Sequence, residues 1–317
     1  MARKQKTEII FHTALKNRIS FGQSKHKDKQ EIGFGKSTYK IYSYGTYSTY
    51  KKECSQYAKW LQDEKGICKI KDIKETEPFA KEYIQYRLDN GVSVYTAKLE
   101  RSALAMLYGK QITIDMPIRD NKGIVRSRHA CEYEKHISRT GKHKDIFTIA
   151  AACGCRRKDI AKLTVNNFIE KEGHLYVKMV KSKGGRDRIA PVVPDLQEDV
   201  KSILERVKND GREKLFDMIP QKIDVHGLRR EYAQSIYTAF EQDREFRDIY
   251  FKVANIPDRR EYKVYKDKEG NTQTREVKAV LYKDRDNNIY DRDDLYAVSQ
   301  ALGHNRLDVS VTHYLKT

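Results

Sequence analysis

The chain has 317 residues, enough for two domains of which one can bury a substantial core. Its 63 lysines and arginines exceed its 45 acidic residues and give a net charge of +18. Such a surplus indicates a polyanionic partner, with nucleic acid the first candidate and an anionic membrane surface the second. A mean hydropathy of −0.81, together with the lack of any run of eighteen apolar residues, argues against a membrane-spanning protein. The basic N-terminus lacks the apolar core and cleavage site of a secretory signal.

The cysteine pattern favours reduced thiols in a cytoplasmic protein. There are five cysteines, an odd number, and no pair has the C-x-x-C spacing. Cys153 and Cys155 are separated by one residue and lack a partner pair of histidines. The sequence therefore predicts no zinc site, no other metal site and no cofactor.

The first part of the chain divides into a basic segment and a helical domain. Residues 1–39 are rich in Lys, Gly and Ser and predict an arm along a phosphate backbone, with a disordered tail as an equal alternative. Residues 40–115 predict a small all-helical domain. Its three helices are expected within residues 44–66, 77–91 and 93–110, each with apolar residues at three- and four-residue steps.

The second part of the chain mixes helices with hairpins. Residues 116–129, with Pro117, Gly123 and little periodicity, are interpreted as a linker, and residues 130–317 as a mixed domain. In order, the patterns in this domain predict two helices joined at Cys-Gly-Cys within 143–168, a hairpin turning at Gly184-Gly185, helices within 194–208 and 224–240, a hairpin within 261–282, and helices within 293–305 and 306–315. The predicted fold class is thus mainly α with small β-hairpins.

Basic side chains recur at places where local structure would fix them. Arg156 follows the tight turn in "CGCRRKDI", and Lys183 stands at the mouth of the hairpin "KSKGGRDR". His226 and Arg229, in "HGLR", are three residues apart and so share a helical face. Each of these residues taken alone has an ordinary structural explanation, because the chain has 63 basic residues.

The chain closes on "LGHNRLDVSVTHYLKT", which holds His304 and Tyr314. The glycine before His304 can be a helix cap, and Tyr314 is one of 21 tyrosines that could simply anchor a docked helix. The alternative is a nucleophile held on a segment that can move. The ordered set of arginine, lysine, histidine and tyrosine favours the second interpretation.

This set resembles the tyrosine recombinase (phage-type integrase) family, which includes lambda integrase, Cre and the Xer proteins. "CGCRRKDI" resembles the first box, T-G-x-R-x-x-E-[IL], with Cys153 and Asp159 as departures; the aspartate keeps the carboxylate. "KGGRDRIAP" resembles the hairpin box K-G-x-[KR]-x-R-x-[VA]-P. "HGLRREYA" resembles H-x-x-R-[HR]-x-[FY]-A, and the C-terminal stretch resembles L-G-H followed by the nucleophilic tyrosine.

The resemblance implies a helical core-binding domain and a catalytic domain that together clamp DNA. It implies a site-specific recombinase of a mobile genetic element, closest to those of low-GC Gram-positive bacteria, in the cytoplasm with the nucleoid. The implied partners are double-stranded DNA, further copies of the chain as a dimer on each site and a tetramer in synapsis, and an accessory excision factor. The implied catalytic residues are Arg156, Lys183, His226, Arg229, His304 and the nucleophile Tyr314, with Asp159 in support.

The chemistry of these residue types agrees with the implied roles. Arginines offer planar, permanently charged forks that match phosphate oxygens, so Arg156 and Arg229 would clamp the scissile phosphate. Lys183 would protonate the leaving 5′-oxygen. A free tyrosine has a pKa near ~10, so Tyr314 needs nearby cations and a proton acceptor such as His226. His304 would donate to a non-bridging oxygen.

Two features depart from the family pattern. About seventy residues separate Arg229 from Leu302, and only three residues follow Tyr314. The hypothesis is that the inserted hairpin, about residues 260–282, docks onto a neighbouring protomer or contacts DNA, with a solvated insertion of no role as the alternative.

Two other functions compete with recombination. A type IB topoisomerase-like enzyme would nick and reseal alone, and a DNA-binding regulator on a recombinase scaffold would not cut. A regulator has no need of all six residues. A metal-dependent nuclease would require clustered carboxylates near these motifs, which the sequence lacks.

Overall fold

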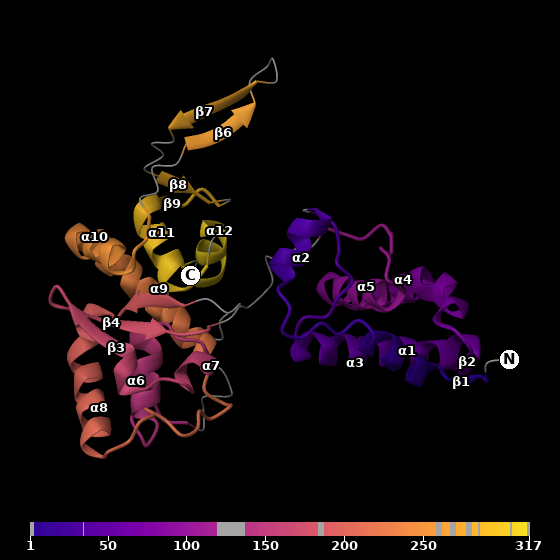
Figure 1. Cartoon of the computed structure of the whole chain (residues 1–317), viewed down its shortest axis with the longest axis horizontal. Coiled ribbons are helices and arrows are strands. Elements are labelled where there is room, and N and C mark those ends of the chain that lie inside the picture. Colours follow the sequence, from indigo (N-terminus) through magenta and orange to yellow (C-terminus); the bar gives the residue numbers. More distant parts are fainter. Residues whose placement is uncertain are drawn as a thin grey trace. The chain divides into compact units, whose positions relative to one another are not determined.

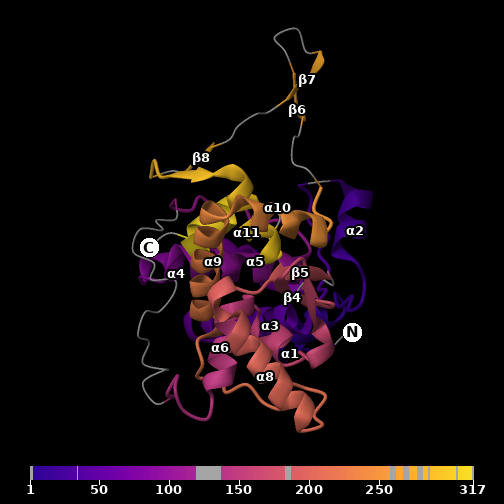
Figure 2. The ribbon, with the colours of Figure 1, turned by 90° about the vertical axis from the view of Figure 1, so that its left-hand side faces the viewer.

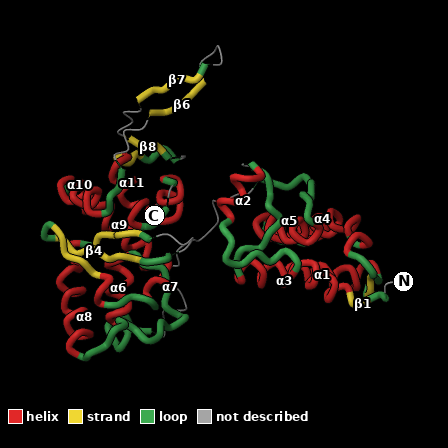
Figure 3. The backbone as a smooth tube through the Cα atoms, in the orientation of Figure 1, coloured by secondary structure: helices red, strands yellow, loops and turns green. Residues whose placement is uncertain are grey.

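The computed structural model describes residues 3–33, 35–118, 137–182, 187–257, 262–266, 271–276, 281–284, 286–304 and 306–315. The chain forms two compact units, Met1–Gly123 and Ile124–Thr317 (Figure 1). Helices predominate over small antiparallel sheets in the described part (Figure 3), which confirms the predicted fold class. Within the described residues, no helix has the length and apolar character needed to span a membrane.

The first unit is a bundle of helices with one short pair of strands. Its elements are β1 (Gln5–Lys6), α1 (Thr7–Lys16), α2 (Lys25–Ile32), α3 (Tyr44–Lys65), β2 (Lys69–Ile70), α4 (Ala80–Asp89) and α5 (Val94–Tyr108). Ser43 caps the start of α3 by accepting from the Thr46 amide, and Gly66 ends it in the left-handed conformation. Aromatic rings of α3 and α4 meet in the core, where Tyr57 lies 4.9 Å from Tyr83 between ring centroids.

The arm predicted for residues 1–39 is wrong for its first half. Residues 5–16 form β1 and α1, and α1 packs against α3. Phe11 and Leu15 are fully buried in the core of this unit, and the Phe11 ring stacks on Tyr57 at 5.7 Å. The physical reason is that two apolar residues four positions apart lie on the same face of a helix. Burying this face in the core lowers the free energy of the folded protein.

The second unit has a helical core around a three-stranded antiparallel sheet. Its elements are α6 (Lys144–Cys153), α7 (Arg157–Ile160), β3 (Phe168–Lys171), β4 (His174–Met179), β5 (Arg188–Pro191), α8 (Gln197–Asn209), α9 (Val225–Gln242), α10 (Arg244–Val253), β6 (Tyr262–Lys266), β7 (Thr272–Glu276), β8 (Leu281–Lys283), β9 (Ile289–Asp291), α11 (Arg292–Ala301), α12 (Leu307–Ser310) and the π-helical turn η5 (Val311–Leu315).

The sheet and the central helices bring distant parts of the sequence together. The strand order is β3-β4-β5, so β4 is central and pairs antiparallel with β5 as predicted, while the predicted turn at Gly184-Gly185 falls outside the described residues. Helix α6 packs against α8 and α9, and α6 and α9 lie side by side in both views (Figures 1 and 2). Helix α11 packs against α9 and β5, and η5 packs against α9. The C-terminal segment therefore returns to the first turn of α9.

Two hairpins lie between α10 and α11 in sequence. The strands β6 and β7 pair antiparallel from Tyr262↔Glu276 to Lys266↔Thr272, as predicted, while the turn at Gly270 falls outside the described residues. A second hairpin, β8–β9, was not expected. Its Tyr282 and Tyr290 pack against the core of the unit.

Candidate active site

Arg156 is held where α6 gives way to α7. Helix α6 ends at Cys153, and Gly154 reverses the chain with φ +57°. Only glycine fits there, because a Cβ would lie 2.2 Å from the Tyr232 ring. Arg156 then takes an extended conformation as the N-cap of α7, and its amide donates to Asp159 Oδ2 at 3.1 Å. The short α7 thus fixes the backbone from which the Arg156 side chain extends.

Arg229 is the most deeply buried charged side chain of the site, with 2% exposure. It lies in the first turn of α9, whose N-terminus is capped by Asp224 through the amides of His226 and Gly227. Its Nη1 donates to the Gly154 carbonyl and its Nη2 to the Leu302 carbonyl. Its Nε donates to the Tyr314 hydroxyl at 3.4 Å.

His304 follows α11 through a left-handed glycine, Gly303 (φ +66°). Its amide donates to the Ser299 carbonyl at 2.7 Å, and its Nε2 lies 3.4 Å from Arg229 Nη2. Burial, followed by the charges of Arg229 and Arg156, lowers the pKa of His304 to about 3. The imidazole is therefore neutral at physiological pH in the DNA-free site.

Tyr314 lies in η5 with only 5% exposure. Its ring sits between two imidazoles, 5.3 Å from His226 and 5.4 Å from His304 between centroids. Partial burial lowers the pKa of His226; Asp224 opposes this effect and Arg229 adds to it. A neutral His226 beside the phenol is able to accept a proton.

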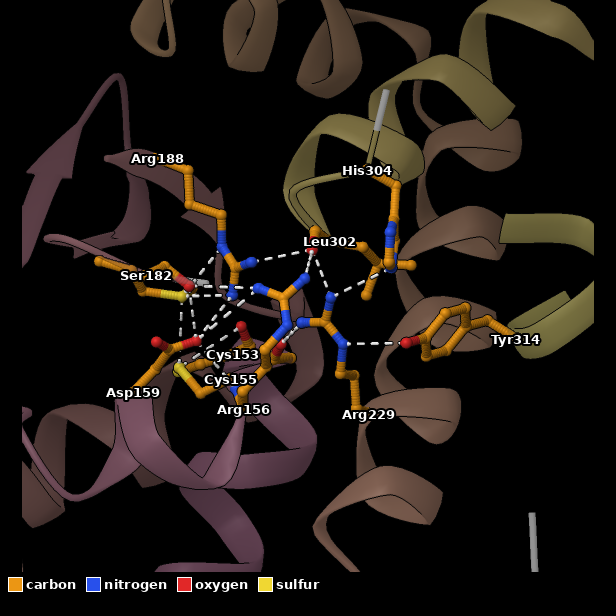
Figure 4. A network of polar contacts seen from close by, with 12 residues as sticks. Cys153, Cys155, Arg156, Asp159, Ser182, Arg188, Arg229, Leu302, His304 and Tyr314 are labelled. Atoms are coloured by element: carbon orange, nitrogen blue, oxygen red, sulfur yellow. Dashed lines mark hydrogen bonds and ion pairs between the residues drawn. The ribbon is translucent and has the colours of Figure 1, made fainter. Parts of the chain in front are cut away.

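A third arginine, Arg188, joins the two that the motifs single out (Figure 4). It is the first residue of β5 and its side chain is 8% exposed. The Leu302 carbonyl accepts from all three guanidinium groups: Arg156 Nη2 at 3.2 Å, Arg188 Nη1 at 2.8 Å and Arg229 Nη2. The position belongs to the hairpin motif "KGGRDRIAP", and only that motif could have drawn attention to it.

Positive charge exceeds negative charge in this cluster. Asp159 Oδ2 lies 3.4 Å from Arg188 Nη2 and 4.0 Å from Arg156 Nη1, and it accepts from the Ser182 hydroxyl at 3.0 Å. Two of the three guanidinium groups thus share one carboxylate, and the third, that of Arg229, contacts main-chain carbonyls instead. Burial and the Arg229 charge lower the pKa of Arg188 to about 10. An anion bound beside the cluster would offset this repulsion.

Of the six predicted catalytic residues, five therefore meet in one place: Arg156, His226, Arg229, His304 and Tyr314. Asp159 lies with them. Lys183 falls outside the described residues. It lies between β4 and β5 in sequence, and of the described residues on either side the Lys181 amide donates to Asp187 Oδ1 at 2.8 Å.

Cys153 and Cys155, on either side of Gly154, are fully buried, and both are free thiols. Burial raises the pKa of Cys153 well above its usual range. Cys155 Sγ lies 3.7 Å from Met179 Sδ. Among the described residues, no group of three or more His, Cys, Asp or Glu side chains is placed to hold a metal ion.

Comparison with known proteins shows the fold. No protein-family model matches the chain, and no curated protein sequence matches it. The XerH site-specific recombinase in a post-cleavage complex with a palindromic difH substrate is similar in structure, with a TM-score of 0.56, 15% identity, and coverage of 98% of this chain and 93% of that chain. XerH in a pre-cleavage complex with difH is also similar, with a TM-score of 0.52 and 16% identity. The match covers 100% of this chain and 95% of that chain. The chain has the fold of these recombinase structures.

Proposed function

We propose that the chain is a site-specific DNA recombinase that cuts and rejoins DNA through a phosphotyrosyl link on Tyr314. The observation that carries the proposal is the contact between Arg229 Nε and the Tyr314 hydroxyl, in a site with a second arginine and two neutral imidazoles. The shared fold with XerH, whose structures hold its DNA substrate before and after cleavage, supports the same function.

In the proposed reaction the Tyr314 oxygen attacks the phosphorus of a DNA phosphodiester. A bond forms between this oxygen and phosphorus, the bond to the 5′-oxygen breaks, and the 5′-oxygen leaves as a hydroxyl. The product is a 3′-phosphotyrosyl link that keeps a phosphodiester, so attack by a 5′-hydroxyl of another strand rejoins DNA without ATP. Because the phosphotyrosyl link and the DNA phosphodiester that it replaces have similar free energies, the step is reversible.

Arg156 and Arg229 stabilise the charge that develops on the non-bridging oxygens, and Arg229 also favours the phenolate of Tyr314. His226, beside the phenol, accepts its proton. His304, next to Arg229, donates to a phosphate oxygen. Lys183, carried on the β4–β5 loop, protonates the leaving 5′-oxygen. Asp159 holds the backbone of Arg156 by accepting from its amide.

The proposed partner is double-stranded DNA, because the reaction acts on DNA phosphodiesters. The sequence resemblance adds the expected assembly, a dimer on each site and a tetramer in synapsis. The net charge of +18 suits contact with many backbone phosphates. The context of a mobile genetic element and an accessory excision factor rest on the sequence resemblance alone.

The test uses a nicked suicide duplex with a candidate recombination site and a denaturing gel. The wild-type chain should become covalently joined to DNA without metal or ATP, and Tyr314→Phe should not. Tight DNA binding without any covalent species would favour a regulator that does not cut. Covalent links with relaxation of supercoils but no exchange between two sites would favour a topoisomerase-like enzyme.

A further inference from the structure

We propose that Arg188 is a positioning residue of this site, which keeps Arg156 free to bind the phosphate by occupying the Asp159 carboxylate and the Leu302 carbonyl. The role of Arg156 in this statement rests on the proposed function. The arrangement of the three arginines rests on the structure itself.

The contacts of Arg188 are with acceptors of the active site. Nη1 donates to the Leu302 carbonyl at 2.8 Å, and Nη2 lies 3.4 Å from Asp159 Oδ2. Nε and Nη2 also contact Met179 Sδ, at 3.0 and 2.6 Å. Both oxygen acceptors are shared with Arg156, which donates to the Leu302 carbonyl at 3.2 Å and lies 4.0 Å from Asp159. Arg188 and Arg156 therefore compete for the same two oxygens.

This competition decides where the Arg156 guanidinium points. Arginine and carboxylate prefer a bidentate pair with shorter contacts than 4.0 Å. Without Arg188, Asp159 would lose its nearer cation and would draw Arg156 into such a pair. The guanidinium would then be turned away from an incoming phosphate, although its charge would remain in the site.

A purely structural role explains the arrangement less well. A buried arginine that shares one carboxylate with another arginine costs free energy, and well-packed apolar residues usually replace such groups without loss of stability. The fold nevertheless makes room for it at Gly303, where a Cβ would lie 2.6 Å from Arg188 Nη1. The turn after α11 thus leaves space for the guanidinium that β5 carries.

The experiment compares three variants of the full chain. Arg188→Met fills the space without charge, Arg188→Lys keeps a charge, and the double variant Arg188→Met with Asp159→Asn also removes the competing carboxylate while keeping an acceptor for the Arg156 amide. Arg206→Gln removes an exposed arginine of α8 that pairs with Asp145 and serves as the matched control. Thermal melting confirms that each variant folds.

Single-turnover formation of the covalent complex is measured on two substrates, a normal suicide duplex and one with a neutral methylphosphonate at the scissile position. On the normal duplex we expect a loss of about 100-fold for Arg188→Met, as for other misplaced catalytic groups. The loss should shrink to within about 10-fold on methylphosphonate, where the arginines have less charge to neutralise. The double variant should recover at least part of the rate, and Arg188→Lys should lie between Arg188→Met and wild type.

Two results would overturn the proposal. One is a wild-type rate for Arg188→Met. The other is an equal loss on both substrates without recovery in the double variant, which is the behaviour of a structural arginine. If Arg188→Met does not fold, Arg188→Lys and Met179→Leu replace it. Met179→Leu removes the sulfur that accepts from Arg188 while keeping a similar side-chain volume. The same two results, a wild-type rate or an equal loss on both substrates, would overturn the proposal.

A second readout separates this proposal from the proposed function. Inorganic phosphate is titrated into wild type and Arg188→Lys while the melting temperature is followed. A positioned clamp predicts stabilisation of the wild type and a shift of at most half that size in the variant. Equal shifts, or no shift in either protein, would overturn the role of Arg188 even if the wild type cleaves DNA. A wild type that never cleaves but shows the expected difference would instead refute the proposed function.

Discussion

Arg229 Nε donates to the Tyr314 hydroxyl at 3.4 Å, and the Arg229 guanidinium carbon lies 5.5 Å from the centroid of the same ring. The two residues are 85 positions apart in the sequence. The first turn of α9 and the turn η5 thus meet through an arginine that also donates to the Gly154 and Leu302 carbonyls. The Arg229 guanidinium therefore links Tyr314 to the turn after α6, which contains Gly154, and to the end of α11, which contains Leu302.

This geometry makes Arg229→Lys a severe change. Lysine keeps one positive charge, but a single ammonium group cannot satisfy two carbonyls and the Tyr314 hydroxyl in the directions that the guanidinium does. We expect the rate of covalent complex formation to fall by at least about 100-fold. Arg206→Lys, on the exposed face of α8, should retain wild-type rates and serves as the control. A loss below about 3-fold would contradict a role for the guanidinium geometry.

The low pKa of His304 predicts a specific dependence of stability on pH. The pKa is about 3 in the folded protein and near ~6.5 in an unfolded chain, so the unfolded state binds a proton between these values and the folded state does not. Stability should therefore be full above about pH 6.5 and decline as the pH falls below it. The lowered pKa of His226 acts in the same direction.

Urea denaturation of the wild type and of His304→Asn at pH 7.5 and 5.5 measures this effect. Asparagine does not titrate, so the variant should lose less stability on acidification than the wild type. His26→Gln, which replaces a histidine on α2 in the other unit, is the matched control. The same loss of stability in His304→Asn and wild type would show that His304 does not contribute.

Much of the fold and of the site follows local sequence signals. The first turn of α9 could be predicted because His226 and Arg229 follow a capping aspartate and precede a helical apolar pattern. The β4–β5 hairpin could be predicted from alternation around two glycines. Such signals are local: the capping aspartate, Asp224, accepts from amides only two and three residues further along the chain.

The contact of three arginine side chains with the Leu302 carbonyl could not be predicted in the same way. Its acceptor is a main-chain carbonyl, which every residue has, and Arg188 is one of 63 basic residues. Only tertiary packing of α11 against β5 brings the two together. The burial of α1 has a weak sequence signal for a different reason: Phe11 and Leu15 are a single apolar pair four residues apart in a segment rich in Lys and Arg.

The position of α1 in the first unit can be tested by mutation. Phe11 is fully buried against Tyr57, so Phe11→Ala should lower the free energy of unfolding of this unit by about 3–5 kcal/mol. Ile9 lies on the same helix but is 52% exposed, so Ile9→Ala should change it by no more than about 0.5 kcal/mol. Urea denaturation followed by circular dichroism measures both. Similar small effects at the two positions would mean that α1 is a loosely attached arm after all.

The hairpin β6–β7 carries none of the candidate catalytic residues. In the described part of the chain, β6 and β7 pair with each other alone, as a two-stranded sheet. The adjacent hairpin β8–β9 is anchored by Tyr282 and Tyr290 and exposes Leu281 and Ile289, by 58% and 63%. Exposed apolar residues beside a paired hairpin favour contact with another protein surface over contact with DNA.

The hypothesis that the inserted hairpin docks onto a neighbouring protomer predicts that deletion of residues 262–280 separates cleavage from exchange. Covalent complex formation on a single suicide site should stay within about 2-fold of wild type, because none of the described catalytic candidates is removed. Recombination between two sites should fall by at least about 10-fold, since loss of one protomer contact worth about 1.4 kcal/mol has that effect on assembly. Native gels of the protein–DNA complex would show fewer tetramers. Full recombination by the shortened chain would refute a docking role, and an equal loss of single-site cleavage would indicate that the hairpin acts on DNA within one protomer.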